Sequence, residues 1–236
     1  MSKRRRAWPY DYGGGSGPLG IFGRQNVALW LRSDLGVTLN GSNVSAWADQ
    51  SGNSQNALQA TGASQPAYTS SGGLAGRPYL SGASGKSLAS AVTLPVGNPY
   101  EIFFVASFGG GSGGMFDSTT VGYPALTTVA NNLTQKLSSS NVNPTALGST
   151  NAGFLCDAYF NTSGAFLYAN GTTTNSTSST GGVTPNEGSG YIVLNTAAGS
   201  AWSGNLYELV LFVGTASTLQ RSQFKAYVAA LYGITP

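Results

Sequence analysis

Apolar residues from Asn26 onward occur in short runs that Gly, Asn, Ser and Pro separate. The runs are rich in β-branched and aromatic residues, which pack well on the pleated surface of a sheet. They predict strands at 27–31, 43–47, 87–94, 100–108, 125–130, 153–160, 164–169, 190–196 and 205–213. Many short strands bounded by turn residues are typical of an all-β sandwich.

One turn is specified by its residue types. A two-residue hairpin turn needs positive φ angles at both central positions, which Asn and Gly tolerate best. Asn170 and Gly171 stand between AFLYA and a run of threonines, so they predict a hairpin. Alternation along the first strand places Phe166 and Tyr168 on one face.

The last twenty residues follow a helical period instead. Apolar residues recur at intervals of three and four, at Phe224, Tyr227, Val228, Leu231 and Tyr232. This spacing puts them on one face of a helix. Ser217 or Thr218 can cap its start, and Gly233 suits its end. The pattern predicts one C-terminal helix that packs on the sandwich.

Residues 1–23 show neither period. They combine a basic run at positions 3–6 with aromatic residues and a glycine-rich stretch. Such a composition is typical of an extended arm or linker. No later boundary divides the rest. The chain is therefore predicted to have an extended N-terminal arm, 1–23, and one β-sandwich domain, 24–236.

Charge is scarce and concentrated in the arm. Only 8% of the 236 residues are charged, about a third of the usual share. Four of the 11 Lys and Arg residues stand at positions 3–6, and the other seven face eight acids, so the rest of the chain carries a net charge of −1. Nucleic-acid binding depends on a basic surface. We therefore expect the folded body to bind no nucleic acid.

The sequence also argues against a membrane span and a secretion signal. No run approaches the ~18 apolar residues that a span requires. The basic run after Met1 is followed by AWPYDYGGGSG rather than by the apolar core of a signal peptide. We therefore expect that the protein is made in the host cytoplasm and that it leaves the cell by a route other than secretion.

Histidine is absent and Cys156 is the single cysteine. Neither an intrachain disulfide nor the usual Cys/His zinc site can be assembled. Cys156 lies in the apolar run GFLCDAYF and has no histidine to activate it. A buried thiol is expected there.

One segment offers oxygen ligands for a cation. Asp49, Asn53 and Asn56 in WADQSGNSQNA could contact Ca²⁺. One carboxylate is a thin ligand set, and the same residue types are typical of a tight turn. The turn is the favoured interpretation, and no metal site is predicted.

Gly109, Gly111 and Gly114 match the spacing of a dinucleotide-binding loop after a predicted strand. That loop requires a helix next, which receives the phosphate at its N-terminus. The following MFDSTTVGYP holds β-branched residues, a glycine and a proline, so no helix is expected. We predict a loop and no cofactor.

Two stretches carry a family likeness, residues 28–68 and 204–234. The first holds a Trp-Leu strand and Trp47-x-Asp49-x-Ser51-Gly52-Asn53. The second holds a strand with Glu208, then a short helix ending in Tyr-Gly-Ile at 232–234. Together they resemble the concanavalin A-like, laminin-G-like jelly-roll domains of bacterial and phage surface proteins. The resemblance implies an all-β, two-sheet antiparallel jelly-roll sandwich with one C-terminal helix, and it implies little about activity.

Catalytic groups are hard to find. Glycoside hydrolysis needs two carboxylates within about 5 to 9.5 Å. Glu101 and Glu208 each stand alone in a predicted strand, although an unrelated pair could still meet in space. A Ser/His/Asp catalytic triad cannot form, because the sequence contains no histidine. The expectation is that the chain is not an enzyme and has no catalytic residue.

Two sets of residues are candidates for binding. Trp202 lies between two predicted strands, and if it is partly exposed its ring can contact a glycan. The arm combines Arg with aromatic residues, a mixture enriched at interface hot spots. Its glycines supply a flexible tether. The candidate docking residues are Lys3, Arg4, Arg5, Arg6, Trp8, Tyr10 and Tyr12.

Two functions follow as hypotheses. The first is a structural protein of a phage virion, a capsid decoration or head-surface protein docked through its arm. Its partners would be the major capsid protein or neighbouring copies, so a homo-oligomer on the virion surface is expected. The alternative is a lectin-like module of a tail fibre or cell surface, which binds host surface glycans or another receptor.

Overall fold

A computed structural model of the chain describes residues 17–94, 98–110, 112–118, 125–129, 132–137, 140–146, 153–161, 164–170, 172–173, 189–194 and 202–236. Residues 1–16 lie outside these ranges, and with them the candidate docking residues of the arm. The docking arm therefore stays a prediction.

Each of the nine predicted strands is present. They are β1 (Val27–Arg32), β3 (Asn43–Trp47), β7 (Leu88–Thr93), β8 (Tyr100–Phe108), β10 (Ala125–Val129), β13 (Gly153–Asn161), β14 (Gly164–Ala169), β16 (Ser189–Val193) and β17 (Gly204–Val213). The predicted hairpin joins β14 to β15 (Thr172–Thr173). Asn170 begins its turn with a φ of 48°, as the sequence predicts, while Gly171 lies outside the described residues.

Seven further strands have no clear signal in the sequence. They are β2 (Val37–Asn40), β4 (Ala57–Leu58), β5 (Ala67–Thr69), β6 (Tyr79–Gly82), β9 (Gly113–Ser118), β11 (Asn132–Leu137) and β12 (Ser140–Ala146). Several of them are only two to four residues long, which is too short to show an apolar period. In β2 most side chains are exposed, so no apolar period is expected there either. The strand β9 occupies residues 113–118, where a dinucleotide-binding loop would begin its helix, while Gly111 and residues 119–124 lie outside the described residues.

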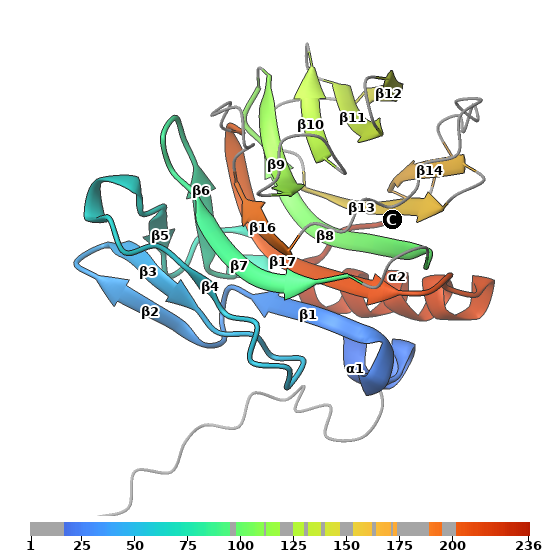
Figure 1. Cartoon of the computed structure of the whole chain (residues 1–236), viewed down its shortest axis with the longest axis horizontal. Helices are drawn as coiled ribbons and strands as arrows, with labels where there is room; N and C mark the ends of the chain where they lie inside the picture. The colour runs from blue at the N-terminus through green and yellow to red at the C-terminus, as the bar shows by residue number, and fades with distance from the viewer. Residues whose placement is uncertain are drawn as a thin grey trace, which may run out of the picture.

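The described strands join into one antiparallel sheet that curls on itself (Figure 1). β17 is the junction, because β8 pairs along one edge while the other edge pairs first with β6 and then with β1. From β6 the pairing continues through β5, β3, β4, β7, β16 and β9. An all-β fold with one long C-terminal helix is thus confirmed. The division into the two sheets of a jelly roll stays a prediction.

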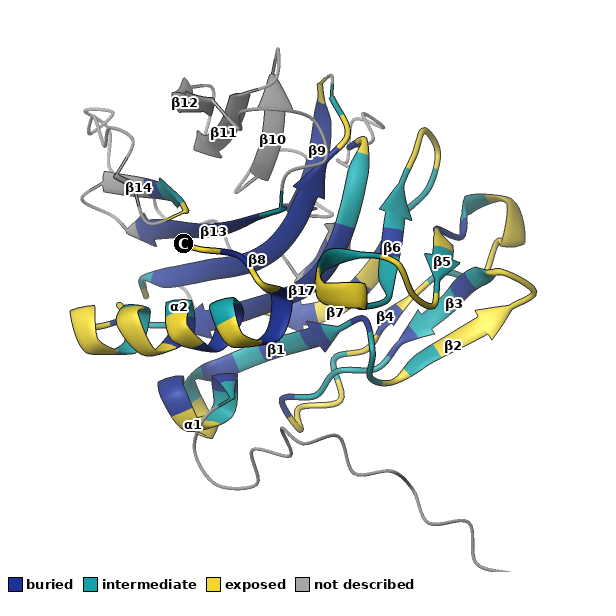
Figure 2. Ribbon diagram, turned by 180° about the vertical axis from the view of Figure 1, so that it is seen from behind, coloured by how far each residue is buried: buried dark blue, intermediate teal, exposed yellow. Residues whose placement is uncertain are grey.

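β8 separates two apolar cores. Ile102 and Phe104 face the inside of the curl, where Trp47 is buried and where Cys156 is buried as predicted. Phe103 lies on the opposite face, toward the C-terminal helix. Successive side chains of a strand point to opposite faces, so both faces of β8 are covered, and Figure 2 shows the strand buried along its length.

The C-terminal helix is α2 (Thr218–Tyr232), and its start is the predicted one. The Ser217 hydroxyl accepts from Gln220 N at 3.2 Å, and the Gln220 side chain accepts from Ser217 N at 2.8 Å. This reciprocal pair satisfies two N–H groups that a helix start leaves free. Gly233 ends the helix with a φ of 67°. The buried residues are the predicted stripe, Phe224, Tyr227, Val228, Leu231 and Tyr232.

A shorter helix, α1 (Pro18–Phe22), corrects the predicted boundary of the arm. Its Phe22 is 2% exposed and packs against Phe103, Phe212 and Phe224 with ring centroids 4.8–5.4 Å apart. Residues 18–22 therefore belong to the body rather than to an arm that ends at residue 23. Three 3-10 helices, Arg24–Asn26, Gly62–Ser64 and Leu74–Gly76, complete the described helical segments.

Glu208 anchors α2 to the sheet. Its buried carboxylate accepts hydrogen bonds from Tyr232 Oη at 2.7 Å, Tyr227 Oη at 2.9 Å and Trp30 Nε1 at 2.6 Å. Burial raises the pKa of Glu208 to about 7, against the opposing effects of Arg32 and of these donors. Trp30 itself is partly buried, and its indole N–H reaches the fully buried carboxylate of Glu208.

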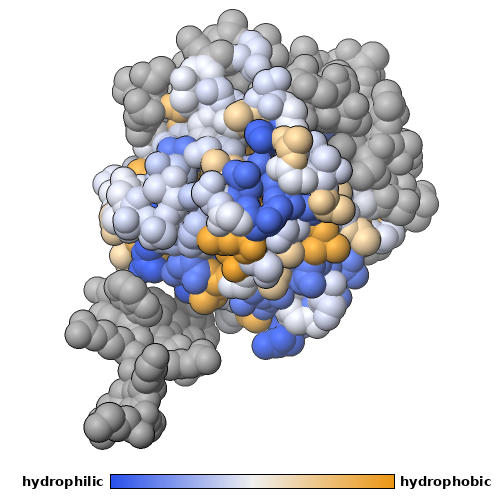
Figure 3. All heavy atoms as spheres, turned by 90° about the vertical axis from the view of Figure 1, so that its left-hand side faces the viewer, coloured by the Kyte–Doolittle hydropathy of each residue, from blue (hydrophilic) through white to orange (hydrophobic). Residues whose placement is uncertain are grey.

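The surface fits the low charge of the sequence. Figure 3 shows one face on which residues of intermediate hydropathy predominate, with small hydrophilic and hydrophobic patches between them. Large exposed hydrophobic side chains in the described part are Leu39, Leu58 and Leu219. Within the described residues, no helix has both the length and the apolarity to cross a membrane.

Tyr232→Phe is expected to lower the free energy of unfolding by about 1.5–3 kcal/mol, since it removes a hydrogen bond to a charged buried group. Chemical denaturation measures the change. Tyr207→Phe is the matched control, because the Tyr207 ring packs against Tyr232 while its hydroxyl has no hydrogen-bond partner in the described part of the chain. Equal losses in both variants would contradict the anchoring role of Glu208.

Candidate functional site

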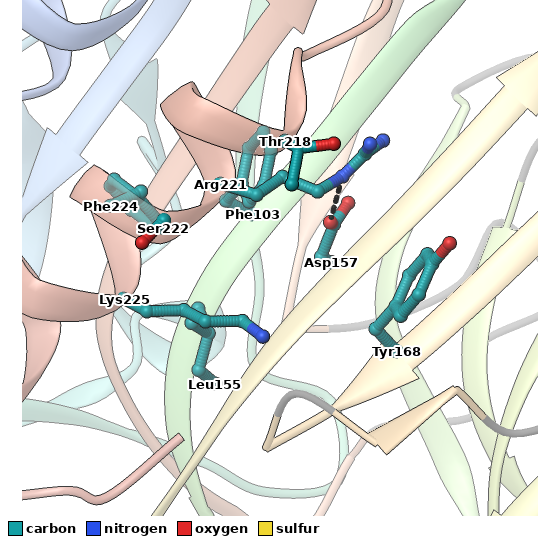
Figure 4. Close-up of a pocket in the computed structure, with 9 residues that line it drawn as sticks. All are labelled: Phe103, Leu155, Asp157, Tyr168, Thr218, Arg221, Ser222, Phe224 and Lys225. Carbon is teal, nitrogen blue, oxygen red and sulfur yellow. Dashed lines mark hydrogen bonds and ion pairs between the residues drawn. The ribbon is translucent and has the colours of Figure 1, made fainter.

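A cavity of about 310 Å³ lies between the first half of α2 and the strands β8, β13 and β14 (Figure 4). Phe103, Leu155 and Phe224 contribute its apolar lining. Its polar lining consists of Asp157, Tyr168, Thr218, Arg221, Ser222 and Lys225. An apolar hollow with a few convergent polar groups is the usual form of a small-ligand site.

Strand register and helical period bring these residues together. Asp157 lies opposite Phe103 on β8 and opposite Tyr168 on β14, so the three share one face of the sheet. Thr218, Arg221, Ser222 and Lys225 are spaced i, i+3, i+4 and i+7 along α2. This spacing places them on one side of the helix, and that side meets the face of the sheet that carries Asp157.

Arg221 connects the helix to the sheet. Its Nε donates to Asp157 Oδ2 at 2.8 Å, and its Nη2 donates to Glu101 Oε1 at 2.7 Å. Nη1 donates to the carbonyl of Ala216 at 2.8 Å. The guanidinium also lies over the Tyr168 ring, 5.6 Å from its centroid, a favourable cation–π position. One side chain thereby holds two carboxyl groups and an aromatic ring in place.

Glu101 and Asp157 form a coupled pair of carboxyl groups. Glu101 is completely buried, and its Oε1 also accepts from Ala216 N at 2.7 Å. Glu101 Oε2 and Asp157 Oδ1 are buried and receive no N–H or O–H donor from the described residues. The negative charge of Asp157 acts on Glu101 and raises its pKa, so the pair favours keeping one proton rather than ionising twice.

Glu101 holds that proton. Burial, and then the charge of Asp157, raise the pKa of Glu101 to about 8, although Arg221 acts in the opposite direction. Burial also raises the pKa of Asp157, while the charge of Arg221 and its hydrogen bond oppose the rise, and the charge of Lys225 opposes it to a smaller extent. Two carboxylates in contact cannot both ionise without a large cost. The pair therefore carries about one negative charge at neutral pH.

Four polar side chains around the cavity are without a partner. Lys225, Thr218, Ser222 and the Tyr168 hydroxyl make no side-chain hydrogen bond or ion pair with the described residues. Figure 4 shows the Lys225 ammonium and the Tyr168 ring on opposite sides of Asp157. These groups are available to a ligand in the cavity.

The predicted glycan contact at Trp202 is misplaced. Its side chain is 0% exposed and belongs to the core inside the curl. Its backbone N–H donates to the Gly114 carbonyl at 3.1 Å, and Gly82 and Gly204 lie against it. The missing side chains of these two glycines make room for the indole. The expectation of partial exposure is therefore wrong.

Asp49 forms the turn that the sequence favours over a calcium site. Its carboxylate accepts from Trp30 N, Ser51 N, Ser51 Oγ and Gln55 N at 2.7–3.0 Å. Asn53 and Asn56 also bond to protein groups nearby. In the described residues, no three His, Cys, Asp or Glu side chains gather as metal ligands would.

Sequence patterns did not indicate the cavity residues, although part of the signal is visible afterwards. Tyr168 was placed on a hairpin face without a partner across it. Arg221 and Lys225 flank the apolar stripe of α2 at a spacing of four. Asp157 has no such signal, because only its register with Phe103 puts it beside the helix.

No protein-family model matches this sequence, and no curated protein matches it either. Solved structures share its fold. A mutant GH54 α-L-arabinofuranosidase soaked with 4-nitrophenyl α-L-arabinofuranoside has a TM-score of 0.65 at 13% identity, over 82% of this chain and 52% of that one. An arabinofuranosidase complexed with arabinofuranosyl-α-1,2-xylobiose has a TM-score of 0.64 at 11% identity, over 80% of this chain and 51% of that one.

Toxin domains are similar as well. The binding domain of botulinum neurotoxin DC, in complex with rat synaptotagmin II, has a TM-score of 0.58 at 12% identity, over 89% of this chain and 52% of that one. Botulinum neurotoxin type C, whose cell entry depends on two ganglioside molecules, has a TM-score of 0.56 at 11% identity, with the same coverage. This chain spans about half the length of each of these proteins.

The expectation that the chain is not an enzyme is contradicted. Three of the structures that share its fold are arabinofuranosidases, which are glycoside hydrolases. The reasoning from isolated acids also fails, because the fold brings Glu101 and Asp157 into contact from separate strands. The fold therefore gives no ground for excluding an enzyme.

The stability of the protein is expected to fall as pH rises from about 5 to about 8. The pKa values of Glu101 and Glu208 are raised from 4.5 to about 8 and about 7 in the folded protein. In this pH range the folded protein keeps protons on Glu101 and Glu208 that the unfolded chain has already released. The stabilisation from these protons is fully present below the pKa of the unfolded chain, and it is lost as the pH rises through the pKa of the folded protein. Each group contributes a slope of at most about 1.4 kcal/mol per pH unit.

Glu101→Gln tests this assignment, since an amide can replace the protonated carboxyl. Denaturation at several pH values should show a flatter dependence between about pH 7 and 8. Glu208→Gln is the control, because it should flatten only the range below about pH 7. An unchanged slope above pH 7 in Glu101→Gln would show that Glu101 does not hold the proton.

Proposed function

We propose that the cavity beside α2 binds a carbohydrate, as a glycan-binding or receptor-binding module does. The observation that carries the proposal is the cavity itself, in which an aromatic ring and four unpartnered polar groups surround an apolar floor. Its volume of about 310 Å³ lies at the lower end of the range for ligand pockets. One sugar ring is the expected occupant.

The lining matches the two kinds of surface on a sugar ring. The C–H face of the ring is apolar and packs on an aromatic ring such as Tyr168. The hydroxyl groups around its edge both donate and accept hydrogen bonds. Asp157 can accept, Lys225 can donate, and Thr218 can do either. Tyr168 is held rigidly by Arg221, so little conformational freedom is lost on binding.

The neighbours support the proposal through what is recorded for them. One arabinofuranosidase was crystallised with arabinofuranosyl-α-1,2-xylobiose, and cell entry of botulinum neurotoxin type C depends on gangliosides. Both cases place a glycan on a protein of this fold. For this chain, these two cases support glycan binding only by analogy of fold. The residues that line the cavity support it independently.

The finer fold class and the setting of the protein are also proposals. We propose a concanavalin A-like jelly roll, in line with the sequence resemblance and with the curled antiparallel sheet. Attachment to a virion through the arm, with neighbouring copies or a capsid protein as partners, stays a hypothesis without a described residue behind it. The glycan-binding alternative is the better supported of the two.

A glycan array tests the proposed function. The full-length protein should retain one group of related glycans, and Tyr168→Ala should weaken that binding by about tenfold, or about 1.4 kcal/mol. Tyr168→Phe keeps the ring and should bind nearly as wild type. Gln223→Ala, exposed on α2 outside the cavity, is the matched control and should bind normally.

Two outcomes would overturn the proposal. One is the absence of any glycan bound by the wild-type protein. The other is a glycan bound equally by wild type and Tyr168→Ala, which would place the carbohydrate site elsewhere. Thermal unfolding of each variant establishes that a loss of binding does not come from a loss of fold.

A further inference from the structure

We infer that the carbohydrate bound in this cavity is an acidic sugar, whose carboxylate is received by Lys225 together with the remaining N–H groups of Arg221. The inference rests on the proposed function and names its ligand class.

Lys225 differs from the other cations of the body. Among the Lys and Arg side chains that the structure describes, each of the others bonds to a carboxylate or a backbone carbonyl. Arg32 and Arg77 pair with Asp34, Arg24 and Lys86 donate to carbonyl groups, and Arg221 pairs with two acids. Lys225 makes no such bond in the described part of the chain: its charge acts on Asp157 from a distance, and its side chain lines the cavity.

The charges around the cavity do not cancel. Glu101 and Asp157 share one proton, so together they carry one negative charge, which Arg221 balances. The Lys225 ammonium is then left over as one positive charge. Because the cavity is partly enclosed by apolar side chains, this charge is screened less than on an open surface. An anionic ligand group would complete the balance.

The donors suit a carboxylate. An ammonium group offers three donors, and a guanidinium offers five N–H groups. Arg221 uses three of its N–H groups on Asp157, Glu101 and the Ala216 carbonyl, which leaves two. Thr218 stands one helical turn before Arg221 and adds a hydroxyl. Charge-assisted hydrogen bonds of this kind are about twice as strong as neutral ones.

The acidic group accounts for features that a neutral sugar does not use. A neutral ring needs the Tyr168 platform and a few polar partners, but it leaves the Lys225 charge without a counter-ion. A sugar with a carboxylate uses both, with its ring on Tyr168 and its acid toward α2. Tyr168 then determines whether a glycan binds, and Lys225 determines which glycan binds.

Matched glycan pairs separate the two claims. The probes are sialyllactose and oligogalacturonate, each compared with its methyl ester, which keeps the ring and removes the charge. The full-length protein should bind at least one acid about tenfold more tightly than its ester. Lys225→Met should lose this preference while keeping the weak binding of the ester. Lys225→Arg should preserve it, and Lys86→Met, on a lysine outside the cavity, should leave it unchanged.

The outcomes distinguish this inference from the proposed function. Equal binding of acid and ester would overturn the acidic ligand and leave a carbohydrate site standing. Binding of neither, with no other glycan bound, would remove both. Preference for sulfated glycans over all carboxylated ones would contradict the carboxylate while still requiring Lys225. Retention of the acid preference by a folded Lys225→Met variant would show that another group receives the charge.

Discussion

The candidate site depends on one interaction, the contact of Arg221 with Glu101 and Asp157. Glu101 is buried on β8 and Asp157 nearly so on β13, and the guanidinium forms an ion pair with each of them. Leaving a buried charge without its partner costs several kcal/mol. Arg221 therefore fixes the first two turns of α2 over these strands. That position of the helix creates the wall of the cavity and holds Tyr168 beside it.

The two carboxyl groups are compatible with a single cation because they share a proton. Were both ionised, the pair would carry two negative charges against one guanidinium in a dry environment. With one proton between them, the carboxyl pair and Arg221 are together neutral, and Lys225, whose charge acts on Asp157 without a direct bond, adds a positive charge at the cavity. Arg221, which belongs to the buried network, and Lys225, which faces the cavity, therefore stand four residues apart on the same helix.

Local patterns predicted most of the fold and little of the site. Strands such as β8 and helix α2 are visible in the sequence because their apolar period extends over nine or more residues. The predicted strand pattern missed β4 and β5, which are too short to show a period, and residues 18–22, whose burial depends on Phe22 meeting α2. The pairing of Glu101 with Asp157 depends on strand register across 56 residues, which alternation alone does not give. The burial of Trp202 was not predicted because it depends on Gly82, which is distant in the sequence, and on Gly204; both leave room for the indole.

The shared proton is the claim on which the charge of the cavity rests, and carboxyl ¹³C NMR of selectively labelled glutamate measures it most directly. The chain contains three glutamates, so Glu101→Gln assigns the signal of Glu101 by its disappearance. The account predicts that this signal titrates with a midpoint near the raised pKa of about 8. A midpoint near the ordinary glutamate value of about 4.5 would contradict it, because the carboxyl pair would then be fully ionised at neutral pH and the cavity would have no surplus positive charge.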